Sequence, residues 1–66
     1  MQIFLNGQPL DLQASISLTQ LLEQKGYAQR RVAVEVNRGI VPKSQHGQHL
    51  LNDGDKVEIV HALGGG

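Results

Sequence analysis

Apolar and polar residues alternate in three stretches of the chain, and this period of two predicts β-strands. In residues 2–12 the alternation is interrupted by Asn6-Gly7, a pair that tolerates the positive φ angles of a two-residue hairpin turn. Pro9 cannot donate a ladder hydrogen bond, so the second strand of this hairpin is expected at a sheet edge or with a late start. Two longer strands are predicted at residues 32–36 and about 56–62.

Between the hairpin and the next strand, the apolar residues change to the period of a helix. Ser17 and Gln20 have the spacing of a capping box, in which each side chain accepts a hydrogen bond from the other residue's backbone N–H. Lys25 suits the C-terminal end of the helix dipole, and Gly26 favours the left-handed backbone that ends a helix. One face of this short helix is apolar and consists of Leu18, Leu21 and Leu22.

Short connections fill the rest of the chain. Arg38-Gly39 predicts a turn, and residues 40–41 predict a short strand after it. Residues 43–48 are polar and indicate a loop or a single helical turn. Leu50 and Leu51 are expected in the core. Residues 52–55 are a dense cluster of turn-forming residues.

The order of these elements is β-β-α-β-(β)-β. One helix with one apolar face can cover one side of a twisted sheet and leaves the other side to solvent or to partners. The sequence therefore predicts an α+β domain, in which a mixed sheet of four to five strands carries one main helix on one face.

Three consecutive glycines close the chain. They have no side chain to bury, so we expect residues 1–63 to form the folded domain and residues 64–66 to form a flexible tail. Fully extended, Leu63 to Gly66 would reach about 13 Å at about 3.3 Å per residue. Such a tail can pass through a channel too narrow for any Cβ atom. It would present an ionised α-carboxylate that is able to attack the α-phosphate of ATP.

Composition limits the classes of function. Sixty-six residues give one domain with a thin core, which favours a module that works with partners over an enzyme acting alone. Six basic residues balance six acidic ones and only two aromatic side chains are present, so the pattern of a nucleic-acid binder is missing. Without cysteine, an N-terminal leader or an apolar run of membrane-spanning length, the chain is expected in the cytoplasm.

Candidate catalytic and metal-binding residues are few. His46 and His49 have a spacing that brings two ligands together on a helix, but no third ligand lies nearby in the sequence and polar neighbours indicate a solvated loop. Ser17 is already assigned to the helix cap, and residues 53–55 lack the rest of a calcium loop. His61 is expected at the rim of the last strand. We therefore predict neither a metal site nor catalytic residues.

Three motifs occur together in this chain. They are residues 32–42 (VAVEVNRGIVP), the turn 53–55 (DGD) with residues 57–60 (VEIV) after it, and the closing Gly-Gly pair. Their combination, at this length, resembles the ThiS family, the sulfur carriers of bacterial thiamine biosynthesis, which have the ubiquitin-like β-grasp fold. The resemblance spans essentially the whole chain, although a terminal Gly-Gly alone is common to ubiquitin-like proteins.

The resemblance implies a cycle of reactions at Gly66. A ubiquitin-activating-type, ThiF-like adenylyltransferase would use ATP and Mg²⁺ to adenylate its carboxylate, and a sulfur-donor relay protein would convert it to a thiocarboxylate. A ThiG-like thiazole synthase would then take the sulfur. Gly65 and Gly66 match the family's terminal pair, and Gly64 is a further glycine that would enter the partners' active sites. The carrier itself would hold no cofactor.

A surface for these partners is expected on the sheet face turned away from the helix. By alternation, Phe4, Val60 and Ala62 point outward there. In a β-grasp fold the first and last strands are parallel neighbours, which would merge these side chains and Leu63 into one apolar patch beside the tail. We predict that this patch is a docking surface, with scattered exposed apolar residues as the alternative.

Other functions remain open at this level. The small subunit of molybdopterin synthase has the same fold and chemistry, but tends to have more sequence between the helix and the last strand. A ubiquitin-like modifier joined to lysines is a second alternative, echoed only by residues 1–4. A plain interaction module with an inert tail is the third.

Overall fold

The chain begins with the predicted hairpin in the computed structural model, which describes residues 1–61. Strand β1 (Gln2–Leu5) pairs antiparallel with strand β2 (Gln8–Asp11). Between them, Asn6 and Gly7 have φ angles of 50° and 82°, and a type I′ turn requires both to be positive. Strand β2 lies at the edge of the sheet, where the missing N–H of Pro9 is tolerated.

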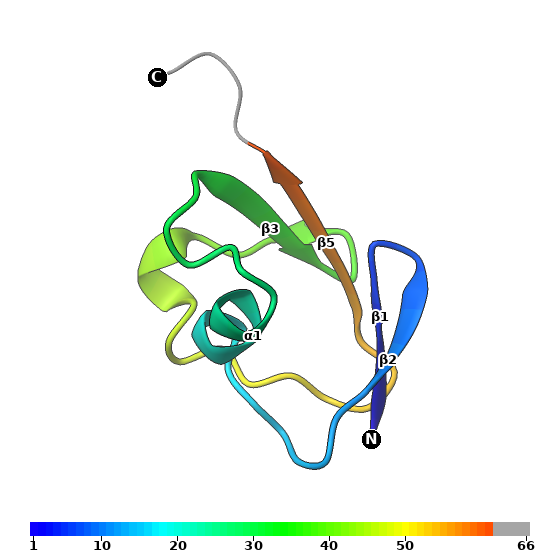
Figure 1. Ribbon diagram of the computed structural model, residues 1–66. Helices are drawn as coiled ribbons and strands as arrows, with labels where there is room; N and C mark the ends of the chain where they lie inside the picture. The colour runs from blue at the N-terminus through cyan, green and yellow to red at the C-terminus, as the bar shows by residue number, and fades with distance from the viewer. Residues whose placement is uncertain (62–66) are drawn as a thin grey trace.

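Five strands form one mixed sheet in the order β2-β1-β5-β3-β4 (Figure 1). The strands after the hairpin are β3 (Val32–Val36), β4 (Gly39–Ile40) and β5 (Lys56–His61). Strand β5 lies in the middle, parallel to β1 and antiparallel to β3. The first and last strands are therefore neighbours, and the predicted α+β architecture is confirmed.

Helix α1 (Leu18–Gln24) has the predicted caps at both ends. The Gln20 backbone N–H donates to Ser17 Oγ at 3.1 Å, and the Ser17 N–H donates to Gln20 Oε1 at 2.9 Å, which completes the capping box. At the other end, Gly26 has a φ of 82° and donates to the Glu23 carbonyl, while Tyr27 donates to the Leu22 carbonyl. These two bonds make a Schellman motif, which directs the chain back toward the sheet.

The N-cap gives a first testable prediction. Replacing Ser17 by Ala removes the acceptor for the Gln20 N–H in a buried position and is expected to lower the free energy of unfolding by about 1 kcal/mol. Urea unfolding followed by circular dichroism measures this change. Ser17→Thr keeps a hydroxyl acceptor and is expected to lose less. Equal stability of the Ala variant and the wild type would show that the cap does not stabilise the fold.

The core lies between α1 and the inner face of the sheet. Leu18 and Leu21 from the helix are fully buried, as are Ile3 and Val57 from the two parallel strands. The predicted apolar face of the helix is therefore confirmed. Among residues 1–61, the buried apolar cluster consists of Ile3, Leu12, Leu18, Leu21, Leu22, Val34, Val36, Val41, Leu51, Val57 and Ile59.

The turn between β3 and β4 lies one residue earlier than predicted. It is formed by Asn37 and Arg38, with φ angles of 52° and 73°, and Gly39 is already part of β4. The side chain of Asn37 holds this left-handed conformation, because its Oδ1 accepts from the Lys56 N–H and its Nδ2 donates to Asp55 at 3.0 Å. Asparagine tolerates this backbone region, so the turn needs no glycine.

Two predictions for the segment after β4 were wrong. His46 was expected in a solvated loop but is buried, and its Nε2 donates to the Val41 carbonyl at 2.9 Å. The residues before it form a single 3₁₀ turn (Lys43–Gln45), as the polar segment allowed. Leu50 was expected in the core and is 59% exposed. It forms an isolated β-bridge with Ser17, and in extended backbone neighbouring side chains point to opposite sides, so Leu51 alone is buried.

Candidate functional site

The candidate site is the end of strand β5, at the last described residue of the chain. The last described residue of this strand, His61, pairs with Val32, the first residue of β3. The predicted tail residues Gly64, Gly65 and Gly66 follow it and lie outside the described residues, as do two residues of the predicted docking surface, Ala62 and Leu63. The structure therefore describes the chain up to His61, the tail base, after which these residues follow in the sequence.

Backbone pairing in the sheet holds the tail base, His61, in place. Strand β5 pairs with β3 at five consecutive positions, up to Val60 with Ala33 and His61 with Val32. The inward side chains of β5 are buried in the core, with Val57 fully covered. A segment attached to the central strand of a sheet has a fixed starting point and direction, which is what the delivery of a chain end into another protein's active site requires.

Strand β5 is also tied to the hairpin turn and to the helix connection. Asn6 Oδ1 accepts a hydrogen bond from the Ile59 N–H at 2.8 Å. The rings of Tyr27 and His61 lie 6.0 Å apart, centroid to centroid, and are inclined by 51°. Tyr27 was not identified from the sequence, although it directly follows the helix-ending Gly26, where an apolar side chain often packs back on the helix.

The outer face of the sheet carries the other predicted docking residues. Val60 is 52% exposed and lies one residue before His61, next to the tail base. Phe4 is half-buried and pairs with Lys56, at the opposite end of β5. Glu58 lies between them on the same face, so Phe4 and Val60 are not adjacent, and the docking surface with Ala62 and Leu63 stays a prediction. The parallel register explains this separation, because β1 pairs only with the start of β5.

The two aspartates of the turn before β5 have structural partners. Asp53 Oδ1 accepts from the Gln2 N–H at 2.7 Å, and Asp55 Oδ2 accepts from the Asn52 N–H at 2.8 Å, which fixes the turn before β5. Residues 1–61 contain no group of three His, Cys, Asp or Glu side chains arranged to hold a metal ion. In the same range, no helix has the length and apolar character needed to cross a lipid bilayer.

Comparison with known proteins identifies relatives along the whole chain. Residues 3–66 match the model of the ThiS family. The sulfur carrier protein ThiS of Escherichia coli K12 is 36% identical over 66 residues, which cover 100% of both chains. The crystal structure of the thiamine biosynthesis protein ThiS from Geobacter metallireducens superposes with a TM-score of 0.87 at 32% identity and also covers 100% of both chains.

Two longer proteins contain a similar segment. Thiazole synthases of Paramagnetospirillum magneticum and Magnetococcus marinus are 47% and 41% identical to this chain over 66 residues. The chain spans only 20% of the length of each of them. The match of residues 3–66 to the family model, together with the full-length likeness to ThiS in sequence and in fold, shows that this chain belongs to the ThiS family.

Proposed function

We propose that this chain is a sulfur carrier for thiazole formation in thiamine biosynthesis, and that Gly66 is the residue that holds the sulfur. The observation that carries this proposal is the full-length likeness to ThiS, in which the family match extends through residue 66. The geometry supports it, because the central strand β5 is the last described element before the glycines in the sequence. The chain then acts as a co-substrate of its partners and not as an enzyme.

Loading of Gly66 with sulfur needs three steps. A carboxylate oxygen of Gly66 attacks the α-phosphorus of ATP in a ThiF-like adenylyltransferase, which binds Mg²⁺, and pyrophosphate leaves. The terminal sulfur of a persulfide on the relay protein attacks the carbonyl carbon, and AMP leaves. A thiol of the relay protein then cleaves the sulfur–sulfur bond, so that a disulfide remains on the relay protein and a thiocarboxylate on Gly66.

A fourth step transfers the sulfur from the carrier to the enzyme that uses it. A ThiG-like thiazole synthase takes the sulfur of the thiocarboxylate into the thiazole ring, and the carrier returns as the carboxylate. Support for this partner comes from the two thiazole synthases that contain a segment similar to the whole chain. Because the activation step consumes ATP, we place the carrier in the cytoplasm.

One experiment tests the proposal and separates the alternatives. The protein is incubated with ATP, Mg²⁺, cysteine, a cysteine desulfurase, the sulfur-donor relay protein and the adenylyltransferase, and its intact mass is then measured. Replacement of one oxygen by sulfur is expected. Attachment to lysines would indicate a ubiquitin-like modifier, and an unchanged mass would indicate an inert tail. The loaded carrier is then offered to thiazole synthase and to molybdopterin synthase, and only the first is expected to accept the sulfur.

A substitution on the outer face tests the docking surface. Phe4→Asp places a charge in a half-buried apolar position beside Lys56 and Glu58. We expect adenylation to slow about tenfold, because a partner that covers this face would have to bury the carboxylate. The rate of pyrophosphate release measures this step.

The matched control for Phe4→Asp is Gln13→Asp. Gln13 is exposed in the loop between β2 and α1, which lies at the opposite end of the molecule from the end of β5 (Figure 1). The control is expected to react like the wild type, and circular dichroism checks that both variants are folded. If Phe4→Asp is adenylated at the wild-type rate, and if thiazole synthase takes its sulfur at the wild-type rate, Phe4 is not part of a docking surface.

A further inference from the structure

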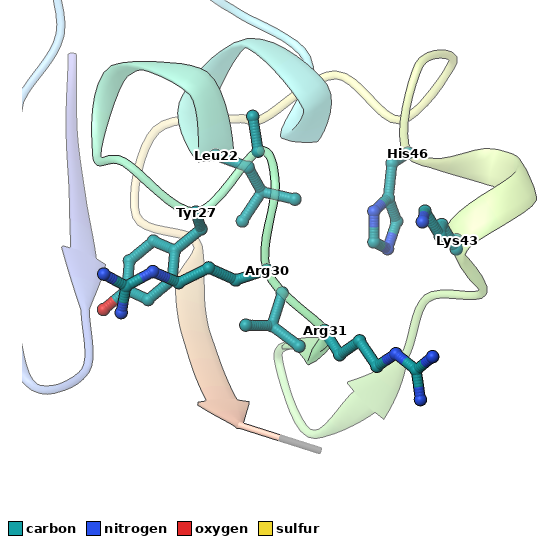
Figure 2. A pocket seen from close by; sticks show the side chains of 8 residues that line it. Leu22, Tyr27, Arg30, Arg31, Lys43 and His46 are labelled. Atoms are coloured by element: carbon teal, nitrogen blue, oxygen red, sulfur yellow. The ribbon is translucent and has the colours of Figure 1, made fainter. Parts of the chain in front are cut away.

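A pocket with a basic rim lies beside the base of the tail. It has a volume of about 180 Å³ and lies between the helix connection, the start of β3 and the 3₁₀ turn. Figure 2 shows Tyr27 and Arg30 on one side of this pocket and Lys43 and His46 on the other. None of these residues was assigned a role from the sequence.

The charged side chains that line this pocket are all basic, although the chain as a whole is neutral and Glu23 lies in the adjoining hollow. Three of its six Lys and Arg side chains, Arg30, Arg31 and Lys43, line the pocket, and none of its six Asp and Glu side chains does. Arg30 and Lys43 are exposed, and within residues 1–61 neither of them forms an ion pair. The rim therefore offers cations to an acidic ligand.

Part of the pocket wall is apolar, beside the buried ring of His46. Leu22 is buried, Val32 is half-buried, and Ala28 contributes a methyl group. A volume of about 180 Å³ is smaller than the pockets of roughly 300–1,000 Å³ that hold drug-sized ligands and cofactors, but a cavity of about 150 Å³ is enough for a benzene ring. The pocket is therefore sized for one apolar side chain.

The pocket lies close to the residue from which the tail follows in the sequence. Val32 pairs with His61, the last described residue before the tail, and Tyr27 contacts the His61 ring. A partner whose active site receives the residues after His61 has to surround the tail base. Tyr27, Val32 and the adjacent basic rim are within reach of such a partner.

From these observations, and from the two thiazole synthases that contain a segment similar to the whole chain, we propose that the pocket receives an acidic segment of thiazole synthase. One apolar side chain of that segment enters the pocket, and flanking Asp or Glu carboxylates pair with Arg30 and Lys43. This inference rests on the proposed function, because thiazole synthase is a partner only if the chain is its sulfur carrier. Complementary charges at such a rim set the orientation of the carrier and speed its association.

The test compares two pairs of charge-neutralising substitutions. Arg30→Gln/Lys43→Gln removes two rim cations, whereas the control Lys25→Gln/Arg38→Gln removes the same charge from positions outside the pocket. Binding of each purified carrier to thiazole synthase is measured by calorimetry at low and high salt. The rim variant is expected to bind roughly tenfold more weakly at low salt, with a smaller difference at high salt. The control is expected to change by less than about twofold.

A third variant tests the apolar part of the pocket. Ala28→Phe fills the space between Leu22 and Val32 with a side chain of the carrier itself and is expected to weaken binding while all cations remain. Thermal unfolding of each variant checks that it is folded. Wild-type affinity in both the rim variant and Ala28→Phe would overturn the inference, as would an equal loss in the rim variant and its control.

Sulfur loading by the adenylyltransferase separates this inference from the proposed function. If the wild type is loaded and binds the synthase, but the pocket variants bind equally well, only the pocket inference fails. If the wild type is not loaded, or does not bind the synthase, the proposed function fails and the pocket inference fails with it.

Discussion

Removal of Gly66 is expected to abolish sulfur loading and leave the folded domain unchanged. The shortened chain still ends in a glycine carboxylate, but this carboxylate is withdrawn by one residue, or about 3.3 Å. A misplacement of only about 1 Å at a reacting centre can cost 10²-fold in rate, so we expect adenylation to fall by at least about 100-fold. Pyrophosphate release and intact mass measure the loss.

Two further variants show whether the position of the carboxylate is the cause. One extra glycine after Gly66 moves the carboxylate forward by the same distance and is also expected to slow loading. Gly47→Ala changes a glycine outside the tail, where the added Cβ would meet Thr19 Oγ1 at an ordinary 3.8 Å, and is expected to load normally. Wild-type loading of the chain that lacks Gly66 would contradict the assignment of this residue.

Leu21→Ala is expected to have the largest effect on stability. Leu21 is fully buried between the helix and the sheet, and such a truncation costs about 2–5 kcal/mol. Small domains often have a total stability near the lower end of about 5–15 kcal/mol, so this variant loses a large part of it. The melting temperature is expected to fall by at least about 8 °C, as measured by thermal unfolding.

The chain offers a matched control for this substitution. Leu50→Ala removes the same atoms from a side chain that is 59% exposed, and its free energy of unfolding is expected to stay within about 0.5 kcal/mol of the wild type. Equal losses in the two variants would contradict the position of the core. The pair also tests the correction at Leu50, which the apolar pattern alone had placed inside.

The elements with strong local signals were predictable from the sequence. The Asn6-Gly7 turn, the Ser17–Gln20 capping box and the stop at Gly26 depend on residues close together in the chain, and each was confirmed. The parallel pairing of β1 with β5 followed only from the resemblance to the β-grasp fold. Nothing in the local pattern of either strand specifies a neighbour some fifty residues away.

The errors have a common physical cause. Contacts made in the fold, which the local sequence pattern does not reveal, decide the conformation and burial of these residues. Asn37 takes the turn position because Asp55 and Lys56, distant in sequence, bind its side chain. His46 is buried because the Val41 carbonyl satisfies its ring nitrogen, although the polar residues around it indicated a loop in solvent.

The register of the sheet had a similar effect on the candidate site. Alternation correctly placed Val60 on the exposed outer face, but it could not show that Phe4 pairs with Lys56 and therefore lies far from Val60 along β5. The basic pocket was also hidden from the sequence. Arg30 and Lys43 are thirteen positions apart, and only the fold brings them to one rim.

Transfer of labelled sulfur from the isolated carrier tests the central claim most directly. The carrier is loaded with a heavy sulfur isotope, purified from the adenylyltransferase and the donor, and mixed with thiazole synthase and its other substrates. The account predicts that the label enters the thiazole and that the C-terminal fragment of the carrier returns to the mass of a Gly66 carboxylate. Label that stays on Gly66, or thiazole that forms without it, would contradict the account.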